Sequence, residues 1–184
     1  GLAALRQCDP VRLGEAALLR LREELQVTCF LAVMGSHGPT ILRFEEPALP
    51  VTINVRAGSV MPLLWSATGR AFLSFSDDAE LRRQAQAELD AALPVQRALL
   101  AQTEPIERLR QQVRTLGCAI VEDTLLRGIS AVAAPILDHT GKVSAVLTAL
   151  GASGGFDTRP TGRICTEVMR EATALSVALG HRPA

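Results

Sequence analysis

The amino-acid sequence predicts an α+β fold in which a mainly antiparallel sheet is packed with helices. Two observations predict it: short segments containing Val, Ile and Phe are joined by close turns, and other segments place apolar residues at helical spacing. The length of 184 residues fits one domain, which can bury a core without a metal or a disulfide. The expected order is a helix, strands, helices, a hairpin and a final helix, as in α+β folds.

The first third of the chain predicts a helix followed by three strands. Asp9 as the N-cap and Pro10 at the first helical position begin the helix, whose apolar residues share one face. Residues 28–34 are nearly all apolar, which predicts a strand covered on both faces. After a turn, residues 40–44 predict a second strand, and the strict alternation of residues 51–55 predicts a third with one buried face.

The middle of the chain predicts helices. Residues 62–75 place apolar side chains on one side of a helix. Asp77 together with Glu80 forms a capping-box pattern, which predicts that a polar helix begins there and ends near residue 93. Pro94 then interrupts this helix, because proline lacks the N–H that a helix interior needs.

A further helix and the clearest hairpin follow. Residues 103–105 begin a helix with an apolar stripe, and Gly117 supplies its left-handed C-terminal cap. Residues 118–121 predict a short strand. Residues 130–138 and 142–150 predict two strands joined by a loop whose glycine can adopt a positive φ.

The end of the chain predicts a glycine-rich linker and a helix. Residues 151–155 lack both the Lys-Ser/Thr of a P-loop and the spacing of a dinucleotide-binding fingerprint, so a flexible linker is favoured over a phosphate site. Residues 160–179 place apolar side chains on one face and predict the final helix.

The composition argues against a nucleic-acid-binding module. Lys and Arg total 19, Asp and Glu also total 19, and no basic cluster is present, whereas contact with phosphates depends on a basic excess. Five Phe, one Trp and no Tyr are too few aromatic residues for a platform that stacks single-stranded bases. We therefore expect this chain itself not to contact DNA or RNA.

No catalytic, metal-binding or cofactor-binding constellation stands out. The histidines lie in predicted turns or in the C-terminal tail, at His37, His139 and His181. The cysteines form no C-x-x-C pair and stand far apart, at Cys8, Cys29, Cys118 and Cys165. We expect reduced, buried thiols and a protein that is not an enzyme and needs no cofactor or metal. Because no apolar run approaches 18 residues and no signal peptide is evident, we also expect a soluble, cytoplasmic protein without membrane contact.

Three segments carry motifs that occur together in one protein family. Residues 58–73, GSVMPLLWSATGRAFL, resemble the Gly-x-x-x-Pro-Leu-His-x-Thr/Ser-x-x-Gly-Lys-Ala-x-Leu segment of IclR-type transcriptional regulators. Residues 128–138, GISAVAAPILD, resemble that family's Gly-Val-x-x-Ile-Ala-Ala-Pro-Val-x-Asp strand. Residues 141–151, GKVSAVLTALG, are similar to its Gly-x-Val-x-Ala-Ala-Leu-Ser-Val-Ser-Gly strand. The order and spacing also match, and the resemblance covers almost the whole chain.

The resemblance implies a fold, a function and partners. Residues 1–184 are expected to form a single GAF-like domain, the C-terminal effector-binding domain of such a regulator. The family's N-terminal winged helix-turn-helix is expected to be absent from this chain, so that the full-length protein contacts DNA only through that domain. The implied partners are a small organic effector and further copies of the chain, in a homodimer or homotetramer.

The resemblance also implies the positions of an effector pocket. The family's pocket positions fall on Ala67, Thr68, Val121, Ile129, Ala131, Thr148 and Leu150. Ser66 joins them as a hydroxyl among apolar neighbours, which needs a hydrogen-bond partner.

This chain departs from the family's pattern at several of these places. Leu64 and Trp65 replace His-Ala, and Arg70 replaces Lys. Val121, Ala131 and Leu150 are apolar where members that bind small keto-acids have acidic, Cys and Ser groups. We therefore expect an effector with a carboxylate or other polar end and an apolar or aromatic body.

Alternative interpretations remain at the level of sequence. Each apolar pocket residue could simply belong to the core, and Trp65 could be an exposed interface anchor. The domain could be a pure dimerisation module with a vestigial pocket, or an enzyme of GAF-like architecture. We expect Arg70 to point away from the pocket, because it lies two residues beyond Thr68 on the predicted helix.

Overall fold

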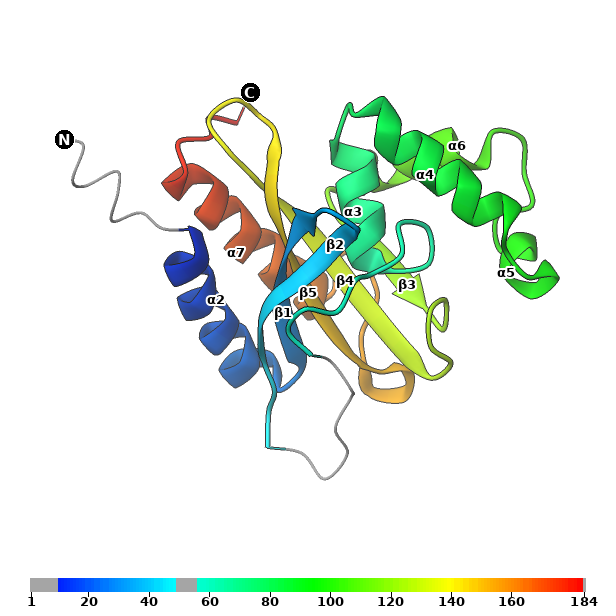
Figure 1. Cartoon of the computed structure of the whole chain (residues 1–184). Helices are drawn as coiled ribbons and strands as arrows, with labels where there is room; N and C mark the ends of the chain where they lie inside the picture. The colour runs from blue at the N-terminus through cyan, green and yellow to red at the C-terminus, as the bar shows by residue number, and fades with distance from the viewer. Residues whose placement is uncertain (1–9, 49–55, 184) are drawn as a thin grey trace.

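Five strands form one antiparallel sheet in the order β2-β1-β5-β4-β3 (Figure 1). The computed structural model of the chain describes residues 10–48 and 56–183. The strands are β1 Thr28–Gly35, β2 Gly38–Glu45, β3 Ala119–Glu122, β4 Ile129–Leu137 and β5 Val143–Ala152. The helices are α2 Pro10–Leu25, α3 Ala67–Phe75, α4 Ala79–Asp90, α5 Pro94–Ala98, α6 Pro105–Leu116 and α7 Arg163–Ala178, with a 3-10 turn at Ser153–Gly155. The α+β prediction is confirmed.

Helices cover both faces of the sheet. Helices α2 and α7 pack on one face and α3 on the other, while α4, α5 and α6 extend beyond α3 and the β3 edge (Figure 1). Alternate residues of a strand face opposite sides, so on β4 Ala131 and Ala133 pack under α3 whereas Val132 packs under α7. The first five residues of β1 are all buried, which confirms the prediction of a strand covered on both faces.

The helix predicted over residues 62–75 begins only at Ala67. Ser66 is its N-cap, with extended backbone angles, and residues 62–66 form a turn in front of it. The helical spacing was misleading because Leu64 is fully buried through this turn rather than through a helix. Trp65 is also only 5 % exposed, so the alternative of an exposed interface anchor is wrong.

The polar helix begins one residue later than predicted. Asp78, not Asp77, caps α4 by accepting a hydrogen bond from the Glu80 backbone N–H at 2.9 Å. The Glu80 carboxylate pairs with Arg83 instead of completing a capping box. The helix ends at Asp90 rather than near residue 93.

Proline and glycine mark the neighbouring helix ends. Pro94 is the first residue of α5 and Pro105 the first residue of α6. The backbone N–H that proline lacks has no partner within a helix at this position, so its absence costs no hydrogen bond. Gly117 has a φ of 84° and supplies the left-handed cap, as predicted. The short strand predicted at residues 118–121 is shifted by one residue, to Ala119–Glu122.

The glycine-rich stretch is more regular than predicted. Gly151 and Ala152 are the last residues of β5, and Ser153–Gly155 form the 3-10 turn, so the linker prediction is wrong for these residues. A Cβ atom on Gly151 would lie 2.8 Å from the Phe156 ring, so the glycine makes room for that ring.

The final helix begins at Arg163 instead of residue 160. The predicted Asp9 cap, Cys8 and the strand over residues 51–55 lie outside the described residues. Within the described ranges, the helices are too short or too polar to cross a bilayer.

Candidate ligand-binding site

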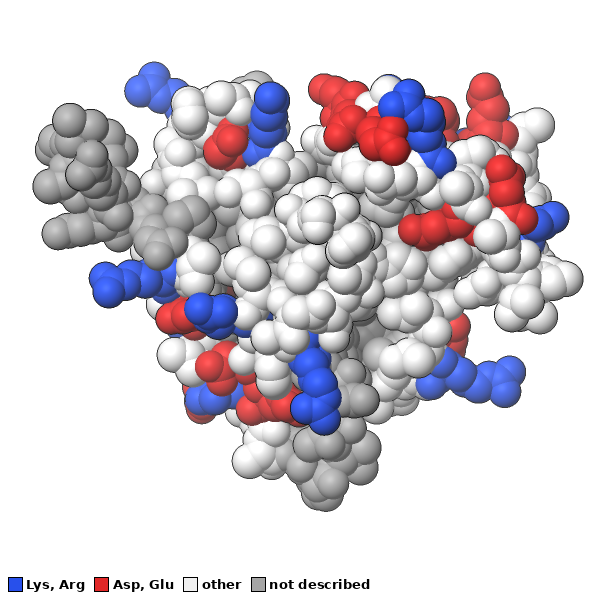
Figure 2. All heavy atoms as spheres, viewed as in Figure 1, with Lys and Arg blue, Asp and Glu red and all other residues white. Residues whose placement is uncertain are grey.

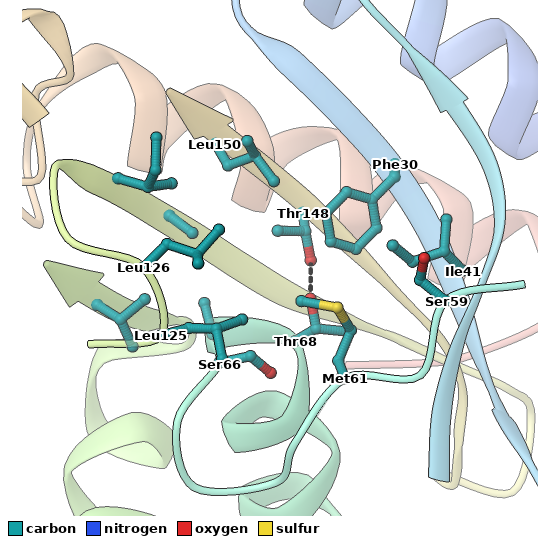
Figure 3. A pocket seen from close by; sticks show the side chains of 14 residues that line it. Phe30, Ile41, Ser59, Met61, Ser66, Thr68, Leu125, Leu126, Thr148 and Leu150 are labelled. Atoms are coloured by element: carbon teal, nitrogen blue, oxygen red, sulfur yellow. Dashed lines mark hydrogen bonds between the residues drawn. The ribbon is translucent and has the colours of Figure 1, made fainter. Parts of the chain in front are cut away.

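A cavity of about 130 Å³ lies between the sheet and the beginning of α3 (Figure 3). All eight residues that the sequence analysis placed in a pocket line it: Ser66, Ala67, Thr68, Val121, Ile129, Ala131, Thr148 and Leu150. Seven of them lie on α3, β3, β4 and β5, and Ser66 is the N-cap of α3. Strand pairing sets Ala131 opposite Leu150. Successive side chains of a strand point to opposite faces of the sheet. Residues 129 and 131 on β4, and residues 148 and 150 on β5, therefore face the same side, where the cavity lies. Their role in binding a ligand remains a prediction.

Two threonine hydroxyls meet at the centre of this cavity. The Oγ1 atoms of Thr68 on α3 and Thr148 on β5 are 2.8 Å apart and hydrogen-bonded, and both residues are 1 % exposed (Figure 3). One hydroxyl donates to the other, so the accepting hydroxyl keeps its own proton and both oxygens keep lone pairs. The pair therefore ties the helix to the sheet and can still hydrogen-bond to a small molecule.

The hydroxyl of Ser66 is used mainly by the protein backbone. It donates to the Pro62 carbonyl at 2.7 Å and accepts the Gly69 N–H at 2.9 Å. Ser66 lines the cavity, but its proton is committed to the turn that precedes α3. Its contribution is to fix the shape of the cavity wall.

The first amide groups of α3 offer hydrogen-bond donors. Among the described residues, the backbone N–H groups of Ala67 and Thr68 have no hydrogen-bond partner, as expected for the first turn of a helix. Both residues line the cavity. The positive end of the helix dipole lies at this point and favours a negatively charged or electron-rich group.

Charged side chains hold the turn before α3 from outside the cavity. The Glu88 carboxylate accepts the N–H groups of Leu63 at 2.8 Å and Leu64 at 2.9 Å. Arg70 donates from Nε to the Leu64 carbonyl at 2.6 Å. Burial lowers the pKa of Arg70 to about 10, so it stays charged at neutral pH. Arg70 does not line the cavity, and none of the described residues that do is charged.

Sequence reasoning missed six residues of the cavity wall. They are Phe30, Ile41, Ser59, Met61, Leu125 and Leu126. Phe30 lies opposite Thr148 because β1 pairs with β5, an adjacency that the sequence did not indicate. Leu125 and Leu126 belong to the loop between β3 and β4, where two apolar residues in a turn were the only available signal.

The described residues offer little support for a metal site or a nucleophilic cysteine. No group of His, Cys, Asp and Glu side chains among them could hold a metal ion. Cys29, Cys118 and Cys165 are buried free thiols. Burial raises the pKa of Cys29 to about 12, so its thiol stays protonated and is a poor nucleophile.

The chain matches the family model described as bacterial transcriptional regulator IclR C-terminal over residues 2–177. It belongs to this family. The three IclR motifs of the sequence therefore reflect a real relationship, and two curated relatives are a probable transcriptional regulator and a regulon regulatory protein.

This IclR-family chain is similar in sequence to two curated proteins and in structure to a third protein. It is 26 % identical to a probable transcriptional regulator SauR of Cupriavidus necator, over 78 % of this chain and 56 % of that protein. It is 31 % identical to a Pca regulon regulatory protein of Pseudomonas putida, over 70 % of this chain and 44 % of that protein. The crystal structure of Pseudomonas aeruginosa HmgR shares the fold, with a TM-score of 0.86 and 33 % identity, over 100 % of this chain and 72 % of that one. The chain spans about half the length of the two curated relatives.

We expect the threonine pair to stabilise the domain. Thr148→Val keeps the shape of the side chain but leaves the Thr68 hydroxyl buried without its partner, which should lower the free energy of unfolding by about 1–2 kcal/mol. Removing both hydroxyls in Thr68→Val/Thr148→Val should cost less than the sum of the single changes, because no unpaired group remains. Urea unfolding of the four proteins measures this coupling. Strictly additive costs would show that the hydrogen bond contributes nothing.

Proposed function

We propose that this chain is the ligand-sensing domain of an IclR-family transcriptional regulator and binds a small organic effector in the cavity between α3 and the sheet. The observation that carries the proposal is the cavity itself, an uncharged, mostly aliphatic space with a buried hydroxyl pair at its centre. Such a combination of apolar walls with a few polar groups is typical of small-molecule sites.

The size and lining of the cavity indicate the class of effector. A dry aliphatic cavity of about 150 Å³ accepts a benzene ring, so the space of about 130 Å³ suits one ring or a short chain. We propose a carboxylic acid with an apolar or aromatic body. Its polar end would meet the hydroxyls of Thr68 and Thr148 and the free amides at the start of α3, with no Arg clamp.

We further propose that the effector acts by population shift. It would bind one of two arrangements of paired subunits more tightly, by no more than the difference in its affinities for the two. DNA binding would belong to a winged helix-turn-helix domain of the full-length, cytoplasmic protein. The face in Figure 2 supports this division, since its acidic and basic side chains surround a broad uncharged centre without a continuous basic area.

Self-association in a homodimer or homotetramer is part of the proposal. Exposed aliphatic side chains around α5 support it: Leu93 is 68 % exposed, Val95 79 % and Leu99 55 %. Clusters of this kind on a surface are typical of protein interfaces.

One observation favours a second candidate, a pure dimerisation domain with a vestigial pocket. Thr68 and Thr148 satisfy each other, so the cavity leaves no buried hydroxyl that requires a ligand. This candidate predicts self-association without any response to small molecules.

A thermal-unfolding screen of the chain with aromatic and aliphatic carboxylic acids tests the proposal. A binder present at 100 times its Kd should add about 2.7 kcal/mol to the free energy of unfolding. If no acid stabilises the chain while sedimentation shows self-association, the dimerisation candidate is favoured instead.

A further inference from the structure

One side of the cavity wall differs from the rest in its exposure. Phe30 is fully buried and Ile41 is 2 % exposed, so the cavity is closed where β1 and β2 line it. Leu125 and Leu126 lie on the other side of the threonine pair in Figure 3 and are 40 % and 54 % exposed. The loop between β3 and β4 is therefore the most exposed part of the wall, while Ser59, Met61 and Ile129 are only partly exposed.

Hydrogen bonds fix the base of this loop. The Asp123 N–H donates to the Ile129 carbonyl at 3.0 Å, and the Asp123 carboxylate accepts the Gly128 N–H. The Ser153 hydroxyl also donates to Asp123, at 3.1 Å, while the Ser153 N–H donates to the Gly128 carbonyl at 2.8 Å. Gly128 has a φ of 81°, which favours glycine at the point where the chain turns back into β4. The base holds the loop so that both leucines lie against the cavity.

We propose that Leu125 and Leu126 determine specificity for the apolar end of the effector, by limiting the length of the group that extends from the threonines toward solvent. This inference rests on the proposed function and adds a direction to it. The polar end of the effector lies near Thr68 and Thr148, and its apolar end contacts the two leucines.

The loop is also the part of the wall that can vary at low cost. Ala131 is 9 % exposed and Leu150 6 %, so replacing either one disturbs the packed core as well as the cavity. Leu125 and Leu126 are half-exposed and lie outside the sheet, so substitutions there change the cavity with little effect on stability. Ligand length is therefore set where the fold constrains the sequence least.

A series of 4-alkylbenzoates, from methyl to hexyl, tests this inference by isothermal titration of the full chain. For the unmodified protein, affinity should rise by about fourfold for each buried CH₂ until the alkyl group reaches the leucines, and then fall. In Leu125→Ala/Leu126→Ala, the best ligand should be longer by at least one carbon. Leu126→Ala alone should shift the optimum in the same direction.

Leu19→Ala is the matched control. Leu19 is 42 % exposed, like Leu125, but lies on α2 and does not line the cavity, so its variant should show the unmodified length profile. If alkylbenzoates bind and a cavity-filling Ala131→Phe blocks them, but both loop variants keep the profile of Leu19→Ala, the loop inference is wrong and the proposed function stands. If no member of the series binds the unmodified chain, both are overturned for this class of ligand.

Discussion

Replacing Gly69 with alanine is expected to lower the free energy of unfolding by about 3–5 kcal/mol, at the severe end for a single added methyl group. A Cβ atom at this position would lie 2.0 Å from the Pro62 carbonyl oxygen and 2.5 Å from Leu63 Cα. Both atoms belong to the backbone, so a change of side-chain rotamer cannot relieve the clash. The turn before α3 would have to move away from the helix, and the wall of the cavity would move with it.

Urea unfolding measures this effect, and Gly154→Ala provides the control. Nothing lies within 4 Å of a Cβ atom on Gly154, so that variant should stay within about 0.5 kcal/mol of the unmodified chain. Equal stability of the two variants would mean that the close approach between α3 and the turn is not maintained in solution.

The second large effect is expected from Ala131→Phe. Ala131 lies on β4 with its side chain at the cavity, and a phenyl ring there should fill the space that an effector needs. Binding of the best carboxylic acid from the screen should be abolished, while overpacking should cost about 1–3 kcal/mol of stability.

Isothermal titration measures the loss of binding, and circular dichroism shows that the variant is folded. Ala16→Phe adds the same ring at an exposed position on α2 and should leave affinity unchanged. A folded Ala131→Phe protein that binds its acid as tightly as before would place the site elsewhere.

The strands that build the site could be predicted from sequence because their patterns are local. Alternation along residues 128–151 is sufficient to put Ile129 and Ala131, and Thr148 and Leu150, on common faces. The family resemblance then supplied Val121 and the start of α3. Gly117 and Pro105 mark helix ends by their own backbone restrictions, without reference to the rest of the fold.

The remaining features depend on contacts between distant residues. Phe30 enters the cavity because β1 lies beside β5, and the two strands are separated by more than a hundred residues of chain. The buried turn at residues 62–66 imitates the apolar spacing of a helix, so its apolar residues gave no sign of where α3 begins. Leu125 and Leu126 acquire their place from the hydrogen bonds of Asp123 and Ser153, which no local pattern reveals.

The two hydrogen bonds of Glu88 tie α4 to the turn that precedes α3. Moving the turn without α4 would break two charge-assisted bonds, each worth about 1.5–3 kcal/mol. This exceeds the 1–3 kcal/mol that typically couples two ligand sites in a protein. We therefore expect α4 to move together with this turn rather than independently of it.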